Sequence, residues 1–416
     1  MFPRILPTIA LPTGAHANPL ALLALTLSAF AIGTTEFVIV GLIPTIAGDL
    51  GVDLPSAGLL VSLYALSVAI GAPLLTALTG RVPRKLLLVG LMALFTAGNL
   101  VAWQAPSYEA LIVARILTGL AHGVFFSVGS IIATSLVPKE KAASAIASMF
   151  SGMTVAFVTG IPLGTFIGQH FGWRTTFLVV SAFGLVALLG SLLFVPRNIR
   201  HTPPAPLLRQ ARVLLQPRLL LVYAMTAVGY GGSLIAFTYL APILQDLAGF
   251  SPNMVGLVLL AYGVSVAVGN IWGGRLADAR GPVKALETIF LALAAVLLVL
   301  GVTAGNPWLL VLTVLAWGAV AFGNVPGLQV YVVRQAERVA PEAVDVASGF
   351  NIAAFNLGVA GGSWAGGLVV AHLGLAHTPW IAALVVFAAF GLTVLSGRLD
   401  RRDAQPQGAG AATGNL

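Results

Sequence analysis

The chain alternates between long apolar stretches and short polar interruptions. A helix needs about 20 mainly apolar residues to cross roughly 30 Å of hydrocarbon. Twelve stretches meet that requirement, with approximate limits at residues 20–46, 56–79, 85–104, 108–136, 142–168, 174–195, 218–245, 253–277, 283–303, 307–332, 344–372 and 379–397. The pattern predicts an all-α membrane protein with twelve transmembrane helices. We interpret the first stretch as a retained span rather than a cleaved signal peptide.

One polar interruption, between Pro196 and Pro217, is much longer than the others. It divides the chain into two halves of six spans each. We assign residues 1–196 to an N-terminal six-helix half and 197–217 to a central cytoplasmic loop. Residues 218–398 form the C-terminal six-helix half, and the small polar residues of 399–416 are expected to be a disordered tail.

Basic residues collect on one side of the predicted spans. All but two of the 21 Lys and Arg residues fall on that side, whereas the other side carries Asp49, Asp53, Glu109 and Asp246. Because loops rich in Lys and Arg stay in the cytoplasm, the basic side is predicted to be the inner one. The sequence therefore predicts a multi-pass protein of the cell (inner) membrane with both termini in the cytoplasm.

Composition narrows the class further. Hydrophobic residues make up 58% of the chain and charged residues only 8%, whereas a soluble domain carries about a quarter charged residues. A net charge of +8 would suit nucleic acid only on a soluble basic face, and no such stripe is present. The absence of Cys excludes disulfides and thiolate metal sites. No metal, cofactor or nucleic-acid partner is expected.

A short internal repeat links the two halves. The segment Tyr64–Gly71 (YALSVAIG) in span 2 matches Tyr262–Gly269 (YGVSVAVG) in span 8, at an offset of 198 residues. The two segments occupy equivalent places in their halves, which indicates two parallel repeats. We therefore expect pseudo-symmetric halves.

Glu36 is the most informative single residue, because it lies well inside span 1 (AIGTTEFVIVGLIP). A carboxylate at that depth costs several kcal/mol unless it is protonated, paired or facing a water-filled cavity. A residue in that position is suited to loading and releasing a proton. The alternative is a structural polar contact within the helix bundle.

Arg115 is the second charge inside the spans, in span 4 (VARILTGLAHGVFF). Arg115 and Glu36 both lie roughly 12–15 Å from the outer end of their helices, so we expect them to meet. Thr118, Gly119 and His122 share one face with Arg115, and this polar face is predicted to line a cavity. A helix-locking ion pair is the alternative role for Arg115.

Small, amide and aromatic residues mark further positions. Gly160, Pro162 and Gly164 in span 5 allow close helix approach and a kink, which indicates a packing and conformational element. Buried amides and aromatics can bind a polar solute or simply pack between helices. The remaining candidates for a substrate cavity are Phe126, Tyr230, Asn324, Asn351 and Asn356.

No enzyme constellation is present in the sequence. The six His residues are scattered, and no HExxH, P-loop or GxSxG motif occurs. We therefore expect a protein that is not an enzyme. A missing P-loop also argues against a self-contained ATP-driven pump, so transport would run on solute or ion gradients.

Several motifs resemble one family, the twelve-span drug/proton antiporter group of the major facilitator superfamily, especially its sugar-efflux (arabinose-efflux-permease-like) branch. Its loop signature G-x-x-x-D-R-x-G-R-K is similar to Thr76–Lys85 (TALTGRVPRK), which keeps Arg81, Arg84 and Lys85 but has Gly80 in place of the acid. The second-half copy, GRLADARG, keeps its acid as Asp278. The resemblance implies that this loop gates the cytoplasmic side.

Two further motifs carry the same resemblance. Arg115, Gly119 and Gly123 are similar to the span 4 motif R-x-x-x-G-x-x-x-G, which the family associates with proton coupling. Gly160–Gly164 (GIPLG) is similar to the span 5 antiporter motif, with Ile161 between the usual Gly and Pro. The resemblance covers residues 20–397 and implies the major facilitator fold.

From these residues we expect a proton-coupled exporter of small solutes that works by alternating access. The resemblance to this branch implies sugars, nucleosides or amphenicol-type drugs as candidate substrates, and the buried amides favour a neutral polar solute. Glu36 would bind the proton and Arg115 would assist it. We expect a monomer whose partners are its substrate, protons and membrane lipid. A facilitator or importer on the same fold is the alternative, and a transporter-like membrane sensor is a weaker one.

Overall fold

The computed structural model describes residues 19–79, 81–138, 142–199, 215–341 and 344–404. Within these ranges every regular element is helical, and twelve helical segments are long and apolar enough to cross a membrane. The all-α fold and the number of spans are thus confirmed. The first six spans are α1 (Pro19–Leu50), α2 (Leu54–Leu78), α3 (Arg84–Trp103), α4 (Tyr108–Ser135), α5 (Ala142–Val155) with η2 (Ala156–Gly160) and α6 (Ile161–Phe171), and α7 (Trp173–Phe194).

The other six spans follow the long polar interruption. They are α9 (Pro217–Phe237) with α10 (Leu240–Pro242) and η3 (Ile243–Leu247), α11 (Pro252–Arg280), α12 (Pro282–Thr303), α13 (Pro307–Ala321) with α14 (Asn324–Val339), α15 (Val344–His372), and α16 (Thr378–Ala404), which follows the short η5 (Leu375–His377). Hydropathy located most ends to within a few residues. The ends of α14 and α16 lie farther out, because these helices continue past the apolar stretch through charged residues.

Part of the segment that was expected to be a disordered tail is helical. α16 continues to Ala404, so the first residues assigned to a disordered tail are helical. Residues 405–416 lie outside the described part of the chain, as do residues 200–214 of the predicted central loop. Pro217 starts α9 at the position where a helix tolerates a missing N–H.

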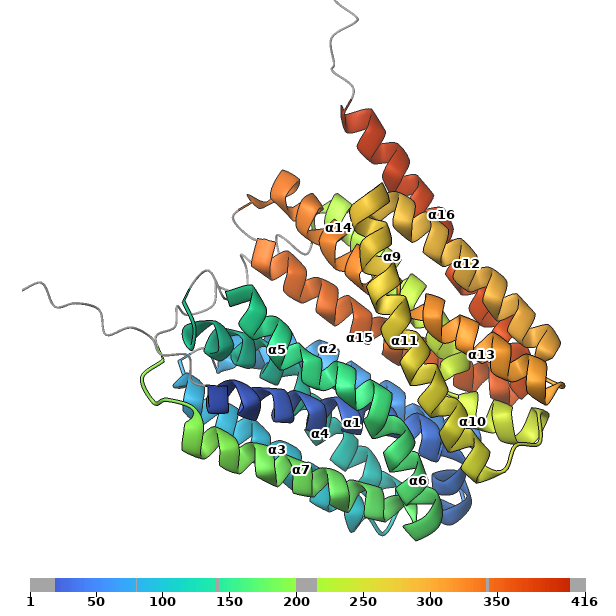
Figure 1. Ribbon diagram of the computed structural model, residues 1–416, viewed down its shortest axis with the longest axis horizontal. Helices are drawn as coiled ribbons and strands as arrows, with labels where there is room; N and C mark the ends of the chain where they lie inside the picture. Colours follow the sequence, from blue (N-terminus) through green and yellow to red (C-terminus); the bar gives the residue numbers. More distant parts are fainter. Residues whose placement is uncertain (1–18, 80, 139–141, 200–214, 342–343, 405–416) are drawn as a thin grey trace, which may run out of the picture.

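The helices form two bundles, α1–α7 and α9–α16, which meet at an angle (Figure 1). We call the end that carries Arg84, Lys284, Arg334 and Arg398 the basic end, and the end that carries Asp49, Asp53, Glu109 and Asp246 the outer end. These names describe positions in the fold.

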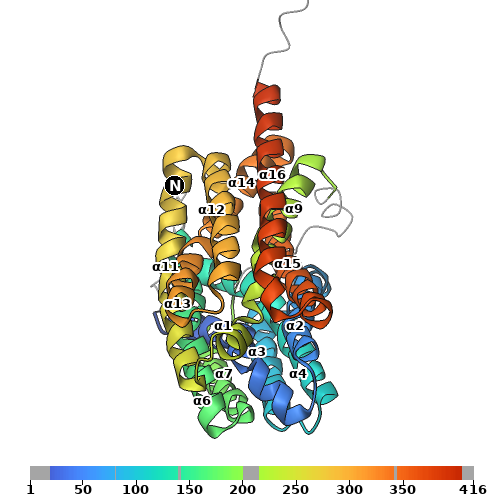
Figure 2. The same cartoon turned by 90° about the vertical axis from the view of Figure 1, so that its right-hand side faces the viewer.

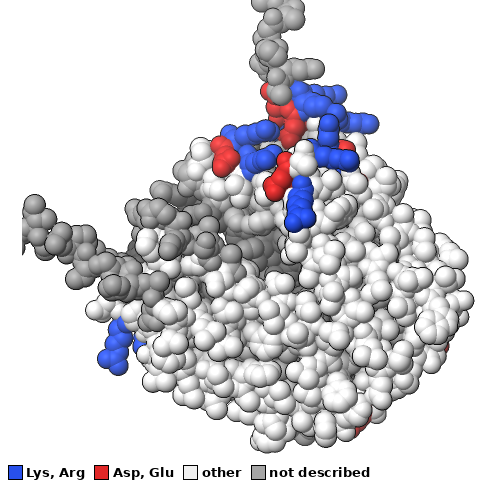
Figure 3. Space-filling model, in the orientation of Figure 1, with Lys and Arg blue, Asp and Glu red and all other residues white. Residues whose placement is uncertain are grey.

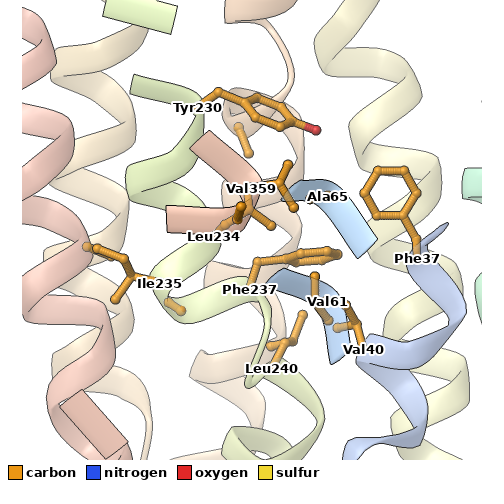
Figure 4. Close-up of a cluster of buried hydrophobic side chains, with 14 of the residues drawn as sticks. Phe37, Val40, Val61, Ala65, Tyr230, Leu234, Ile235, Phe237, Leu240 and Val359 are labelled. Atoms are coloured by element: carbon orange, nitrogen blue, oxygen red, sulfur yellow. The ribbon is translucent and has the colours of Figure 1, made fainter. Parts of the chain in front are cut away.

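The two halves share a core only toward the outer end. One large apolar cluster combines the outer part of α1 (Phe37–Ala47) and α2 (Ala57–Ala65) with side chains of the C-terminal half. Figure 4 shows this junction, with Phe37 and Val61 facing Phe237 and Leu240. A second cluster holds the basic-end part of α1 together with α3, α4 and α5, and contains no residue of the C-terminal half.

The halves consequently diverge toward the basic end. The space-filling view is hollowed between the two halves on that side (Figure 3). No hydrogen bond or ion pair between described residues joins the halves. Contacts that are apolar and non-directional can re-form at a different angle, which suits two bundles that rock against each other.

The internal repeat is visible in the packing. A Cβ atom on Gly119 of α4 would lie 2.6 Å from the Tyr64 carbonyl oxygen of α2. One on Gly318 of α13 would lie 2.9 Å from the Tyr262 carbonyl oxygen of α11. Two helices in each half therefore approach so closely at equivalent points that only glycine fits.

Candidate functional site

Two charged side chains are buried inside the N-terminal half. Glu36 lies in the middle of α1 with 7% of its surface exposed, and Arg115 lies in α4 with 1% exposed. Neither fits an apolar helix unless other groups compensate its charge or hydrogen-bonding needs. Their contacts explain how both are accommodated.

Arg115 is held mainly by backbone oxygens. Its Nη1 atom donates to the Thr35 carbonyl at 2.7 Å, and Nε donates to the Leu60 carbonyl at 3.2 Å. Nη2 donates to the carbonyl of Glu36 at 3.4 Å. The guanidinium also lies 4.1 Å from the centre of the Tyr64 ring, a cation–π contact. Arg115 therefore joins α4 to α1 and α2.

The expected meeting of Glu36 and Arg115 takes place at the Glu36 backbone, and no ion pair joins the two side chains in the described structure. The carboxylate instead faces His122, whose Nδ1 atom lies 3.9 Å from Oε2 of Glu36. The same Nδ1 lies 2.9 Å from the Tyr64 hydroxyl. Carboxyl, imidazole and phenol thus lie in a short row, in which the imidazole–phenol contact is a hydrogen bond and the carboxyl–imidazole contact is longer than one.

A buried hydrogen bond that the sequence reading missed fixes α1 beside this row. The Thr35 hydroxyl donates to Asn99 Oδ1 at 3.0 Å, and the Asn99 amide donates to the Phe95 carbonyl at 2.9 Å. Asn99 is fully buried in α3. The sequence feature that could have identified Asn99 is its single amide inside an otherwise apolar span.

The charged cluster has no counterpart in the other half. Val314 precedes Gly318 by four residues, as Arg115 precedes Gly119, and Ala321 follows Gly318 by three, as His122 follows Gly119. The C-terminal half makes the same close helix contact without either charged or titratable side chain. The packing of this fold therefore does not require them.

Aromatic rings connect the cluster to the junction between halves. Phe126 packs against the His122 ring with centroids 5.2 Å apart, and it stacks on Phe150 at 4.8 Å. Phe157 contacts Phe37 of its own half at 4.8 Å and Phe322 of the other half at 4.7 Å. Most of these rings meet edge to face, and together they provide an apolar surface on both halves.

Tyr230 lies on the C-terminal side of this surface. Its ring packs edge-on against Phe322 at 5.4 Å and Phe355 at 5.1 Å. In Figure 4 the Tyr230 ring extends from α9 toward the N-terminal half, with its hydroxyl in the lead. It is 7% exposed, like Glu36.

The three Asn candidates have different surroundings. Asn351 is fully buried and bonds Thr226 Oγ1 at 2.7 Å and Gln329 Oε1 at 2.9 Å, so it ties α15 to α9 and α14. Asn356 donates to the Ile352 carbonyl of its own helix, and Asn324 at the start of α14 donates to the Ala321 carbonyl at the end of α13. The Oδ1 atoms of both have no partner in the described structure. Asn356 keeps 7% exposure, whereas Asn324 is fully buried.

The span 5 motif packs against α1. A Cβ on Gly160 would collide with Thr34, and one on Gly164 with Val38. Just before Pro162 the helix takes one π-helical turn, η2, where the ring of proline removes an α-helical hydrogen bond. Gly263 of α11 lies against this turn. A Cβ atom added to Gly263 would lie 3.0 Å from the Phe157 carbonyl oxygen. A point of contact between the halves thus lies at an irregular turn.

The loop residues at the basic end are not brought together. Arg84 is buried at the start of α3, and Lys85 donates to the Leu192 carbonyl at 2.7 Å. Arg81 and Asp278 are exposed, and no ion pair involves them in the described structure. Gly80 lies outside the described residues.

The family model of the Major Facilitator Superfamily matches residues 25–340. This chain belongs to the Major Facilitator Superfamily. It is 50% identical to the uncharacterized MFS-type transporter YtbD of Bacillus subtilis (strain 168), over 94% of this chain and 98% of that protein. It is 40% identical to the inner membrane transport protein YdhP of Escherichia coli (strain K12), over 91% and 96% of the two chains.

A third relative is the chloramphenicol resistance protein of Streptomyces lividans, 34% identical over 89% of this chain and 94% of that one. These relatives agree with the branch that the motifs indicated. The fold matches the crystal structure of a bacterial homolog to the human lysosomal transporter Spinster, with a TM-score of 0.73, 17% identity, and coverage of 94% and 99%. The chain is therefore a multi-pass membrane transporter of the major facilitator fold.

Proposed function

We propose that this transporter exports small neutral solutes in exchange for protons. The observation that carries the proposal is the cluster of Glu36, His122, Tyr64 and Arg115 in one of two otherwise similarly packed halves. Buried charges are costly and the second half is built without them, so a functional demand is the simplest reason to keep them.

Glu36 is the proton carrier in this proposal. Protonation removes its charge, and deprotonation leaves a carboxylate near the fixed positive charge of Arg115 and beside His122. Binding of a solute at the Glu36 side chain and protonation of that side chain would exclude each other. Such exclusion lets the inward flow of protons drive the outward movement of solute.

The proposed orientation places the basic end in the cytoplasm, because loops rich in Lys and Arg remain inside. The halves separate at that end and close at the outer end, which corresponds to a state that loads solute from the cytoplasm. Rocking about the apolar junction would then open the outer end for release.

Among sugars, nucleosides and amphenicol-type drugs, we favour a neutral solute with an aromatic ring. Phe126 packs against His122, which faces Glu36. Phe37, Phe157 and Tyr230 belong to the ring cluster at the junction of the halves, so aromatic rings are available to stack on a solute. The chloramphenicol resistance protein among the relatives supports the same choice.

Transport by reconstituted protein tests the proposal. Proteoliposomes with an imposed pH gradient are supplied with chloramphenicol, arabinose or uridine as probes of the three classes. We expect Glu36→Gln to lose accumulation against a gradient and to keep energy-independent exchange of labelled solute. Glu109→Gln, an exposed acid at the outer end, is the control and should behave as the unmodified protein.

Two results would contradict the proposal. Normal proton-driven accumulation by Glu36→Gln would remove Glu36 from coupling. Accumulation of solute on the side toward which the protons flow would identify a proton-coupled importer instead of an exporter.

A further inference from the structure

A small pocket lies at the basic end of the C-terminal half, separate from the charged cluster of α1 and α4. It forms where α11 passes into α12, and α14 and α16 close its sides. Figures 1 and 2 both show these helix ends grouped together. Its volume of about 180 Å³ is below the 300–1,000 Å³ of sites that enclose a drug-sized ligand. The pocket suits a compact group.

Four cationic side chains and one carboxylate line the pocket: Arg280, Lys284, Arg334, Arg338 and Asp400. Figure 3 shows basic side chains concentrated over this part of the surface. The excess of positive charge favours an anion.

The carboxylate is already occupied by neighbours. Asp400 Oδ2 accepts from the Tyr331 hydroxyl at 2.8 Å, and Oδ1 accepts from the Gln335 amide at 2.7 Å. Arg338 lies 3.8 Å from Oδ1. The side-chain nitrogens of Arg280, Lys284 and Arg334 have no hydrogen-bond or ion-pair partner among the described residues. These three cations are available to a ligand.

The beginning of α12 adds to the positive potential. Gly281, with φ of 78°, turns the chain, and Pro282 occupies the first turn of the helix. Both residues line the pocket. The first-turn N–H groups of a helix are unpaired and carry the positive end of its dipole, which complements phosphate.

An apolar track leads from the pocket along the membrane-facing surface. Leu291 and Leu298 follow Lys284 at intervals of seven residues, so the three share one face of α12. Leu291 is 49% exposed and Leu298 is 43% exposed. A ligand with a phosphate at Lys284 and a hydrocarbon chain below it would match both surfaces.

We propose that this pocket binds the phosphate of an anionic phospholipid headgroup, with an acyl chain lying along Leu291 and Leu298. Basic pockets between helices at the inner face of a membrane recognise such headgroups. The site would attach the C-terminal half to one leaflet, and the proposal does not depend on the identity of the transported solute.

The test uses the purified full-length chain in detergent after removal of bound lipid. Thermal unfolding and native mass spectrometry follow titration with phosphatidylglycerol, with phosphatidylcholine, and with inorganic phosphate. The variant is Lys284→Gln with Arg334→Gln. Arg401→Gln with Arg402→Gln is the control, because it removes two exposed cations of α16 that do not line the pocket.

We expect phosphatidylglycerol to bind the unmodified protein and the control in preference to phosphatidylcholine. The pocket variant should bind it roughly 30-fold more weakly, because each of the two basic residues contributes about fivefold. Equally weakened phosphatidylglycerol binding in both variants would show that general surface charge, and not the pocket, attracts the lipid. That result would overturn the proposal. Binding of inorganic phosphate as strong as that of phosphatidylglycerol would also overturn it, because the ligand would then be free phosphate. Failure of proton-driven export would leave this outcome unaffected, since lipid binding is measured without transport.

Discussion

The Arg115 guanidinium contacts Glu36 through the backbone carbonyl of Glu36, 3.4 Å from Nη2, and not through the carboxylate. The positive charge is therefore fixed near Glu36 while the carboxylate remains free to gain or lose a proton. A direct ion pair would resist protonation more strongly. Under the proposed function, this arrangement keeps a fixed cation near the acid that carries the proton.

Arg115→Lys should be damaging although the charge is unchanged. Arg115 uses a planar fork to reach the carbonyls of Thr35 and Leu60, whereas a Lys ammonium on a flexible stem serves one of them. We expect a loss of about 2 kcal/mol of stability from the unsatisfied buried groups. Thermal unfolding in detergent measures the loss, and Arg197→Lys at an exposed site is the control. An unchanged unfolding temperature in Arg115→Lys would show that the fork geometry is unimportant.

The sequence predicted the helices better than the site. Apolar length determines where most spans begin and end, so the twelve spans were found, and only helices that continue through charged residues, α14 and α16, end well beyond their predicted limits. Depth along a helix was also readable, and it correctly placed Glu36 and Arg115 at similar levels. Depth does not specify how each helix is rotated. That rotation directs the carboxylate toward His122 and the guanidinium toward Thr35.

The amides illustrate a second limit. Asn351 and Asn356 lie on the same span, and nothing in their spacing distinguishes a solute contact from a tie between helices. Only the tertiary structure brings Thr226 and Gln329 to Asn351. Asn356 keeps a free Oδ1 and some exposure, and it is the better candidate for a solute contact.

His122→Gln should separate hydrogen bonding from proton exchange. A Gln side chain can still bond the Tyr64 hydroxyl but cannot pass a proton to or from Glu36, so we expect solute exchange to persist and the pH profile of driven transport to change. Transport rates measured from pH 5.5 to 8 test this, with the exposed His170→Gln as control. A pH profile that coincides with that of the unmodified protein would limit His122 to a structural role.

Gly119→Ala and Gly318→Ala form a matched pair across the repeat. Each added methyl group meets a backbone carbonyl of the facing helix, so each should destabilise the fold by about 1–3 kcal/mol. Only Gly119→Ala displaces Tyr64 beside the charged cluster. At a temperature where both variants are folded, we expect the ratio of driven transport to exchange to fall in Gly119→Ala alone. Equal ratios would indicate that the cluster is not specific to coupling.

Asp53 should contribute stability that depends on pH at the outer end. Hydrogen bonds from the Ser56 side chain and backbone N–H lower the pKa of Asp53 below its usual value of 3.8. A lowered folded pKa means that this stabilisation is complete above the unfolded pKa and is lost as the pH falls through the folded one. Asp53→Ala should cost about 1 kcal/mol at pH 7 through loss of the α2 cap. Unfolding temperatures of the variant and the unmodified chain should converge in strong acid, and a constant difference would contradict the prediction.

The closed outer end contains a buried hydroxyl, that of Tyr239, which the substitution Tyr239→Phe removes. Tyr239 is fully buried, and its hydroxyl has no partner in the described structure. It lies between a glycine of each half: a Cβ on Gly58 of α2 would collide with it, and one on Gly367 of α15 would lie 2.9 Å away. An unpaired buried hydroxyl costs about 1–3 kcal/mol, and opening the outer end to water would relieve that cost.

Tyr239→Phe should therefore favour the closed outer end and lower the population of the outward-open state by tenfold or more, at 1.4 kcal/mol per factor of ten. Because the chain contains no Cys, spin labels can be attached at Glu109→Cys and Asn253→Cys, one at the outer end of each half. Distances between the labels report how often that end opens. The same label pair without the Tyr239 change is the reference. A larger open fraction in Tyr239→Phe would mean that the hydroxyl stabilises the closure through a partner such as bound water.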